Sequence, residues 1–275
     1  MGVMTEIISS QLNLWEQPAP AAWIDYTRRN DPAAPYWVDH LQKQLEAHGQ
    51  PEVLCFWTKA PAVVASLYRD MIRSLQEAGT LVLAQVTDNH YGLVLEPGIL
   101  PERAGLQPLV ELLGAQAVRL CFDPIIPGFT TFEHFQACLE DALRCGIQRI
   151  TINWIAIKKY KRVADRLQRA GISPQEAAED EQAAFARQLL SQAGRRVELA
   201  VCAESHKLVR QVPELKTAAC ADMAWAVALH TGLGGRLKKR PSRSGCGCCY
   251  SGDWGSYTWV RAPKCAHGCV YCYAG

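Results

Sequence analysis

Short apolar runs alternate with longer amphipathic segments along most of the chain. The short runs are rich in β-branched and aromatic residues, a pattern typical of buried strands. The longer segments repeat apolar residues every three or four positions, which predicts helices packed on one face. The expected strands are residues 22–27, 53–57, 80–86, 117–122, 148–154 and 197–202. The expected helices are residues 35–47, 61–77, 101–113, 131–144, 158–170, 174–193 and 219–230.

This repeated strand–helix alternation predicts an α/β fold with parallel strands and helices outside them. Because six such units occupy about 200 residues, we expect a partial (β/α)6 TIM-like barrel, with a doubly wound open sheet as the alternative. The barrel should span residues 21–232, after an irregular leader at 1–20. A Cys-rich tail at 233–275 follows it and carries no periodicity.

Polar side chains stand at the ends of several expected strands. In either α/β architecture the carboxyl ends of the strands meet at one rim, where ligands bind. We therefore expect these residues to converge, although each alone fits a helix cap or a loop hydrogen bond equally well. They are Arg28, Arg29, Thr58, Lys59, Thr87, Asp88, His90, Asp123, Cys202 and Glu204.

The charge and hydropathy of the chain argue against two classes of partner, nucleic acids and membranes. The chain has 275 residues, 49% of them hydrophobic, and a formal net charge of +2. This near-neutral charge argues against nucleic acid as the main partner, and the basic run from Arg236 to Arg243 is typical of a solvated loop. Neither a secretory signal nor a long apolar span is visible, so we expect a cytoplasmic protein that does not bind a membrane.

Cysteine is the unusual residue: the chain has 12, six of them after Ser244. In a reducing cytoplasm, clustered thiols indicate metal ligands or redox groups rather than disulfides. The most compact group is Cys265, Cys269 and Cys272, with the spacing CxxxCxxC. Three thiolates on one loop can hold three irons of a [4Fe–4S] cluster and leave the fourth iron open. An open iron can chelate S-adenosylmethionine (SAM), and reductive cleavage of SAM then supplies a radical.

Two further residues of this segment suit the cluster. Gly268 permits the turn between the first two cysteines, and Tyr271 is positioned to pack beside the adenine of SAM. The alternative is a zinc site completed by His267. His267 lies between two of the cysteines, however, and the paired CxxC spacing of zinc sites is absent, so the pattern favours iron and sulfur.

A second group of cysteines lies upstream. Four of its members could ligate an auxiliary iron–sulfur cluster, with Cys249 the least expected ligand, or some could be small buried hydrophobes. The group comprises Cys202, Cys220, Cys246, Cys248 and Cys249. The other cysteines fall on expected strands and helices and are predicted to belong to the core: Cys55, Cys121, Cys138 and Cys145.

Short motifs rich in polar, glycine and cysteine residues are spread along the chain. They are TRRNDP (27–32), FWTKAP (56–61), LEP (95–97), FDPI (122–125), KKYKR (158–162), CAE (202–204), RSGCGC (243–248), SGDWGSY (251–257) and CAHGCVYCYA (265–274). Together they resemble a known bacterial and archaeal family, domain of unknown function 1848. The resemblance runs from about Tyr26 to the end of the chain, and its most specific piece is the terminal CAHGCVYCYA.

The resemblance implies a radical SAM-like barrel whose cluster loop comes from the C-terminal tail and folds over the carboxyl rim of the strands. In this family the terminal cysteines are similar to the cluster loop that radical SAM enzymes carry near the N-terminus. By the family pattern, four cysteines of the second group also recur, which favours the auxiliary cluster: Cys202, Cys220, Cys246 and Cys248.

The function expected from all this is a radical SAM-like enzyme with an unknown substrate. Its partners would be SAM, that substrate, and a reductant such as flavodoxin or ferredoxin. Candidates for binding the polar groups of SAM or the substrate are Arg29, Lys59, Asp123 and Glu204. The alternatives are a zinc-stabilised binding module without enzymatic activity and an iron–sulfur protein for electron transfer or sensing without SAM chemistry.

Overall fold

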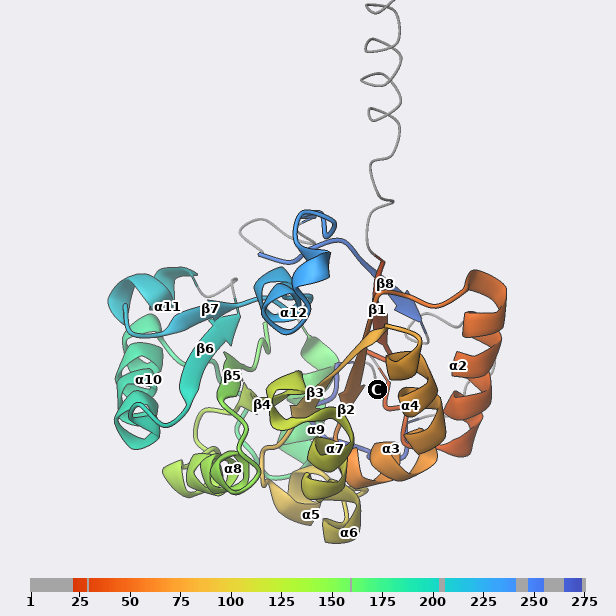
Figure 1. Cartoon of the computed structure of the whole chain (residues 1–275). Helices are drawn as coiled ribbons and strands as arrows, with labels where there is room; N and C mark the ends of the chain where they lie inside the picture. Colours follow the sequence, from red (N-terminus) through yellow and green to blue (C-terminus); the bar gives the residue numbers. More distant parts are fainter. Residues whose placement is uncertain are drawn as a thin grey trace, which may run out of the picture.

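The computed structural model describes residues 22–28, 30–158, 160–202, 206–240, 247–254 and 265–273. Within these ranges the chain builds one sheet surrounded by helices (Figure 1). The strands are β1 (Trp23–Tyr26), β2 (Val53–Thr58), β3 (Leu81–Thr87), β4 (Val118–Ile125), β5 (Arg149–Trp154), β6 (Glu198–Cys202), β7 (Lys216–Ala218) and β8 (Ser251–Trp254).

The helices fill the connections between successive strands. They are α2 (Pro35–His48), α3 (Pro61–Leu67), α4 (Arg69–Glu77), α5 (Gly92–Leu95), α6 (Pro101–Ala104), α7 (Gln107–Leu113), α8 (Phe132–Arg144), α9 (Lys161–Arg169), α10 (Glu179–Ala193), α11 (His206–Gln211) and α12 (Met223–Leu229). Two short 3-10 turns, Ala115–Ala117 and Thr231–Leu233, precede β4 and follow α12.

The eight strands form one parallel sheet in the order β7-β6-β5-β4-β3-β2-β1-β8. The predicted α/β class is therefore confirmed, but the expected number of six strands was too low. From β1 to β7 each strand lies beside its predecessor, without the reversal of order that defines a doubly wound sheet. β7 and β8 are the two edges, and in the described part of the chain no pairing joins them, so closure of the sheet into a barrel is not shown.

The larger core lies between the sheet and its helices. Alternate strand residues face it because successive side chains of a strand point to opposite faces. Phe56, Leu120 and Ile150 are fully buried there, as are Leu41 of α2 and Phe135 of α8. All four cysteines predicted to be structural are buried, which confirms that expectation: Cys55, Cys121, Cys138 and Cys145.

Two expected helices are each split into two. The segment from Pro61 to Glu77 breaks at Tyr68, whose buried hydroxyl donates to the carbonyl oxygen of Pro32 (2.9 Å). The segment from residue 101 to 113 breaks at Gly105, which follows α6, and Pro108 is the second residue of α7. Glycine disfavours helical backbone, and proline is accommodated only in the first turn of a new helix.

The opposite face of the sheet is covered near its middle by α12 (Figure 1). Trp225 of α12 packs in a second core with Trp23 and Leu83. Arg119 of β4 is buried on this face; its Nη2 donates to Oδ2 of Asp222 (2.6 Å), and its guanidinium lies 4.3 Å from the Trp225 ring centre. Asp222 also caps α12 by accepting from the Trp225 main-chain N–H. These contacts hold α12 on the sheet.

Four elements escaped prediction because they are too short to show a period: α5, α11, β7 and β8. The last of them, β8, lies in the Cys-rich tail and pairs with β1, with Ser251 opposite Trp23. The tail therefore contributes one edge of the sheet. Within the described residues, no helix is both long and apolar enough to cross a membrane.

Candidate functional site

The terminal cysteine segment, residues 265–273, lies against the connection between β3 and α6. The main-chain N–H of Val270 donates to the carbonyl oxygen of Leu95 (2.9 Å). The main-chain N–H of Gly98 donates to the carbonyl oxygen of His267 (2.9 Å). Because that connection follows the carboxyl end of β3, the segment reaches the rim that the sequence predicted.

Gly98 is required for this close approach. A Cβ atom built on Gly98 would overlap the carbonyl oxygen of Ala266, so any other residue would push the segment away. On the other side, Arg166 of α9 donates from Nε to the carbonyl oxygen of Val270 (2.8 Å) and from Nη2 to that of Cys272. The backbone of the cysteine segment is thus held from two directions.

Tyr271 is the buried anchor of the segment. Its hydroxyl accepts hydrogen bonds from Nζ of Lys59 (2.7 Å) and Nδ2 of Asn89 (3.0 Å), and donates one to Glu96. Lys59 Nζ also lies 2.9 Å from Oε1 of Glu96. Lys59 directly follows β2 and Asn89 follows β3, so two strand ends and one loop meet at this hydroxyl.

The charges of this group depend on one another. Burial raises the pKa of Glu96, but the Lys59 ammonium and the Tyr271 hydroxyl outweigh burial and leave that pKa below its ordinary value. Burial lowers the pKa of Lys59, but Glu96 and the nearby Cys269 reverse the effect and raise it. Burial also raises the pKa of Tyr271 well above its usual range, and Glu96 adds to the rise. Lys59 and Glu96 are therefore a charged pair, and Tyr271 is a neutral donor.

The three thiols of the segment lie close enough to interact electrostatically with one another. Each is partly exposed, and Gly268 adopts a φ of 60° at the turn between the first two. Burial raises the pKa of Cys265, and raises that of Cys269 to about 12, although the Lys59 ammonium opposes the rise at both thiols. A metal that binds to these two thiols and to Cys272 must displace the thiol protons.

His267 points into the protein and away from a shared site with the thiols. It is buried, and its Nε2 lies 2.7 Å from Oδ2 of Asp31. Asp31 also accepts from the Thr58 hydroxyl (3.0 Å) and from the main-chain N–H groups of Ala33 (3.0 Å) and Lys59 (2.6 Å). Within the described residues, His267 forms no group with two of the thiols whose ligand atoms all lie within 4.8 Å of one another.

Asp123 stands at the same rim, near the end of β4. Its main-chain N–H donates to Oδ1 of Asn89 (2.9 Å), and its carbonyl oxygen accepts from Nδ2 of the same amide (2.9 Å). Burial raises the pKa of the Asp123 carboxyl to about 6, against the opposing effects of Lys59 and a hydrogen bond from Asn153. Asp123 is thus a carboxyl group that titrates near neutral pH beside the cysteine segment.

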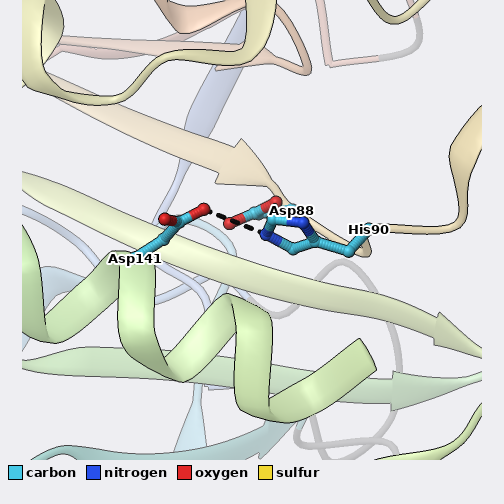
Figure 2. A group of neighbouring side chains, drawn as sticks. All are labelled: Asp88, His90 and Asp141. Atoms are coloured by element: carbon cyan, nitrogen blue, oxygen red, sulfur yellow. Dashed lines mark hydrogen bonds and ion pairs between the residues drawn. The ribbon is translucent and has the colours of Figure 1, made fainter. Parts of the chain in front are cut away.

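A second rim cluster involves Asp88, His90 and Asp141 (Figure 2). Nε2 of His90 lies 3.1 Å from Oδ1 of Asp88 and 2.9 Å from Oδ2 of Asp141. The hydrogen bond to Asp88 raises the pKa of His90 above its ordinary value. Asp141 also pairs with Arg144 one turn along α8. The imidazole of His90 thus lies between two carboxylates, both of which face the same ring nitrogen.

Three cysteines of the upstream group come together elsewhere. The thiol of Cys220 contacts those of Cys202 and Cys248, and the Arg28 guanidinium lies close to Cys220 and Cys248. The neighbouring Cys249 is buried, its main-chain N–H donates to the carbonyl oxygen of Ala221 (3.0 Å), and its thiol interacts electrostatically with Cys248.

The remaining predicted site residues, Arg29, Glu204 and Cys246, lie outside the described residues. Sequence reasoning did not single out Asp31, Glu96 or Asn89, which hold the terminal segment. Asp31 and Glu96 fall inside two of the quoted motifs, TRRNDP and LEP, and only this membership could have indicated their role from the sequence. For Asn89 there was no indication in the sequence beyond its place in a loop after a strand.

Comparison with known proteins places the chain in a family. A search of curated proteins found no match. The family described as Domain of unknown function (DUF1848) matches residues 30–274, from just after β1 through the terminal cysteine segment. Since this match spans most of the chain and agrees with the resemblance seen in the motifs, the chain belongs to the DUF1848 family.

Proposed function

We propose that this protein is an iron–sulfur enzyme of the radical SAM type. Cys265, Cys269 and Cys272 would hold a [4Fe–4S] cluster with one open iron, and SAM would bind there. When bound and reduced, such a cluster supplies reductive cleavage of SAM. The carrying observation is that the three thiols are presented together on a loop anchored at the carboxyl rim of a parallel sheet.

The position of the loop supports catalysis. In α/β folds with parallel strands, reactive groups gather at the carboxyl ends of the strands because loops from several units meet there. Lys59 and Asp123 come from the ends of β2 and β4 and interact with each other electrostatically. These two would contribute charge to the pocket in which SAM or the substrate binds. The strand winding also supports a partial barrel of the radical SAM kind, with its cluster loop supplied by the tail.

The donor set supports a cluster more than a single ion. Within the described residues, the sulfur atoms of the three thiols do not all lie within 4.8 Å of one another, as the ligands of one ion would. Thiolates on a cubane bind different irons and are therefore spread more widely. His267, the fourth ligand of the zinc alternative, is directed at Asp31 instead.

The surrounding side chains have assigned tasks in this proposal. The Lys59 ammonium stabilises the thiolate form of Cys269, because it opposes the effect of burial on that thiol. Tyr271, held by Lys59, Glu96 and Asn89, fixes the backbone between the second and third cysteines. The hydroxyl of Tyr271 is hydrogen-bonded inside the protein. Contact between the Tyr271 ring and the adenine of SAM stays a prediction.

The test is anaerobic reconstitution of the full chain with iron and sulfide, followed by reduction in the presence of SAM. We expect the terminal site to bind about four irons, and SAM to be cleaved. The triple variant Cys265→Ser, Cys269→Ser, Cys272→Ser should lose these irons and all SAM cleavage. Cys145→Ser, at a buried cysteine that follows α8, is the matched control and should retain both.

Three results would contradict the proposal. Stoichiometric zinc without sulfide would favour the zinc-stabilised module. A cluster without SAM cleavage, whichever of several reductants is used, would favour electron transfer or sensing. Unchanged iron content and SAM cleavage in the triple variant would exclude the terminal cysteines as the site.

A further inference from the structure

Three cysteines far apart in the sequence converge on the face of the sheet that α12 covers. Cys202 ends β6, and the strand register places it opposite Ala218, the last residue of β7. Cys220 follows two residues later. Cys248 lies shortly before β8, and the hydrogen bond from the next main-chain N–H to the carbonyl oxygen of Ala221 (3.0 Å) brings it beside Cys220.

The side chains of these cysteines meet one another. The Cys220 thiol contacts both the Cys202 and the Cys248 thiols, and these contacts, with burial, raise its pKa well above the usual range. Cys248 is only 4% exposed, whereas Cys202 and Cys220 are partly accessible. The Nε2 amide of Gln85 fixes the backbone at Cys220 by donating to its carbonyl oxygen (2.8 Å).

The guanidinium of Arg28 lies close to two of these cysteines, Cys220 and Cys248. Burial lowers the pKa of Arg28, but Cys220, Asp25 and Cys248 together raise it. Its Nη1 lies 3.7 Å from Oδ2 of Asp25, and its guanidinium lies 5.3 Å from the ring centre of Trp57. Cysteines that only pack, such as Cys138 in the larger core, are surrounded by apolar side chains. Here three thiols instead lie near a guanidinium, which opposes the rise in the pKa of the Cys220 thiol, although the contacts with Cys202 and Cys248 and burial outweigh it.

We propose that Cys202, Cys220 and Cys248 hold a second, thiolate-ligated metal centre, separate from the terminal loop. Thiolates select iron–sulfur clusters and zinc, and either takes the place of the thiol protons. Within the described residues the three sulfur atoms do not all lie within 4.8 Å of one another, which favours a cluster over a single ion. Arg28 offsets the negative charge that three thiolates bring to the site. The centre would also tie the segment after β7 to the segment before β8, the two edges of the sheet.

The test begins from the triple serine variant of the terminal cysteines, which removes the other site. After anaerobic purification and reconstitution, this variant should retain one metal centre per chain. Adding Cys220→Ser should abolish the remaining metal, whereas adding Cys145→Ser should not. Iron with acid-labile sulfide would identify the cluster and support the site. Zinc without sulfide would contradict a cluster there, because it would place a single ion among sulfur atoms that do not all lie within 4.8 Å of one another.

A folded terminal variant that holds no metal would overturn the proposal, as would an unchanged metal content after Cys220→Ser. Because separate cysteines are removed, either result leaves the proposed SAM chemistry of the terminal loop untouched. If these variants do not fold, alkylation of the wild-type chain decides. Cys202 and Cys220 should become markedly more reactive after chelation, and equal reactivity before and after chelation would contradict a metal there.

Discussion

Tyr271 links the terminal cysteines to the interior of the protein. It occupies the position between Cys269 and Cys272 that sequence reasoning assigned to contact with a ligand. In the structure its hydroxyl joins Lys59 and Glu96, a buried charged pair that follows β2 and β3. A residue inside the motif therefore fixes the geometry of the motif. The consequence is that loop order and metal retention should depend on one oxygen atom.

Replacing Tyr271 with Phe tests this dependence. The change leaves Lys59 and Asn89 each short of one acceptor in a buried site, which should cost about 1–3 kcal/mol of unfolding free energy. Urea unfolding of the metal-free protein measures the stability, and the rate of iron loss to a chelator measures retention. We expect both lower stability and faster iron loss.

Tyr273→Phe is the matched control, because the Tyr273 hydroxyl is at the surface and accepts only from the Ala156 main-chain N–H (3.2 Å) among the bonds described for it. It should change both measurements little. Equal effects of the two substitutions would contradict the anchoring role of Tyr271.

Asp123 predicts a pH dependence of stability. Its pKa of about 6 exceeds the ordinary value of 3.8, so between these values the folded state binds more protons than the unfolded state. The contribution is fully present below pH 4 and is lost as the pH rises through 6, with a total of about 3 kcal/mol. Relative to wild type, Asp123→Asn should therefore gain unfolding free energy from pH 4 to 7 in urea titrations. A constant difference across this range would show that Asp123 titrates normally.

At the scale of elements, α12 depends on charged contacts. Asp222 accepts from Arg119 of β4 and caps the first turn of α12. Arg119 is 1% exposed, so removal of its partner leaves a buried cation unpaired. The position of α12 therefore depends on this charged pair as well as on the apolar contacts of Trp225.

Asp222→Ala should destabilise the protein by about 3–5 kcal/mol, because the uncompensated charge remains buried. The exposed pair Lys207–Glu179 supplies the control: Lys207→Ala should cost less than about 1 kcal/mol. Urea or thermal unfolding at neutral pH compares the two. If Asp222→Ala is no more harmful than Lys207→Ala, the charged contacts do not hold α12.

The strands and most helices were predictable because their apolar patterns reflect burial directly. Short elements were not predictable: β7 and β8 are too brief to show alternation, and their pairing with β6 and β1 becomes visible only in the folded chain. At the site, the position of Lys59 and Asp123 at the rim was predictable, because both stand at the ends of expected strands. The roles of Asp31 and Glu96 did not, because a carboxylate in a loop reveals its partners only once the tail has folded back.

At the scale of the whole molecule, the Cys-rich tail has two structural tasks. It adds β8 to the edge of the sheet beside β1, and it brings the terminal cysteines to the rim at the ends of β2 and β3. Segments from the beginning and the end of the described chain therefore pair at the β8 edge of the sheet and meet again around the terminal cysteines. If the terminal cysteines hold the proposed cluster, this arrangement places the cluster at the rim where α/β enzymes carry out their chemistry.

The most direct test of the central claim is the effect of SAM on the electron paramagnetic resonance signal of the reduced protein. If one iron of the terminal cluster is open, adding SAM should change the part of the signal that Cys269→Ser abolishes. A signal that is lost in Cys269→Ser but stays identical with and without SAM would contradict the claim, because the cluster would then have no open iron for SAM. Absence of any signal that depends on Cys269 would contradict it as well.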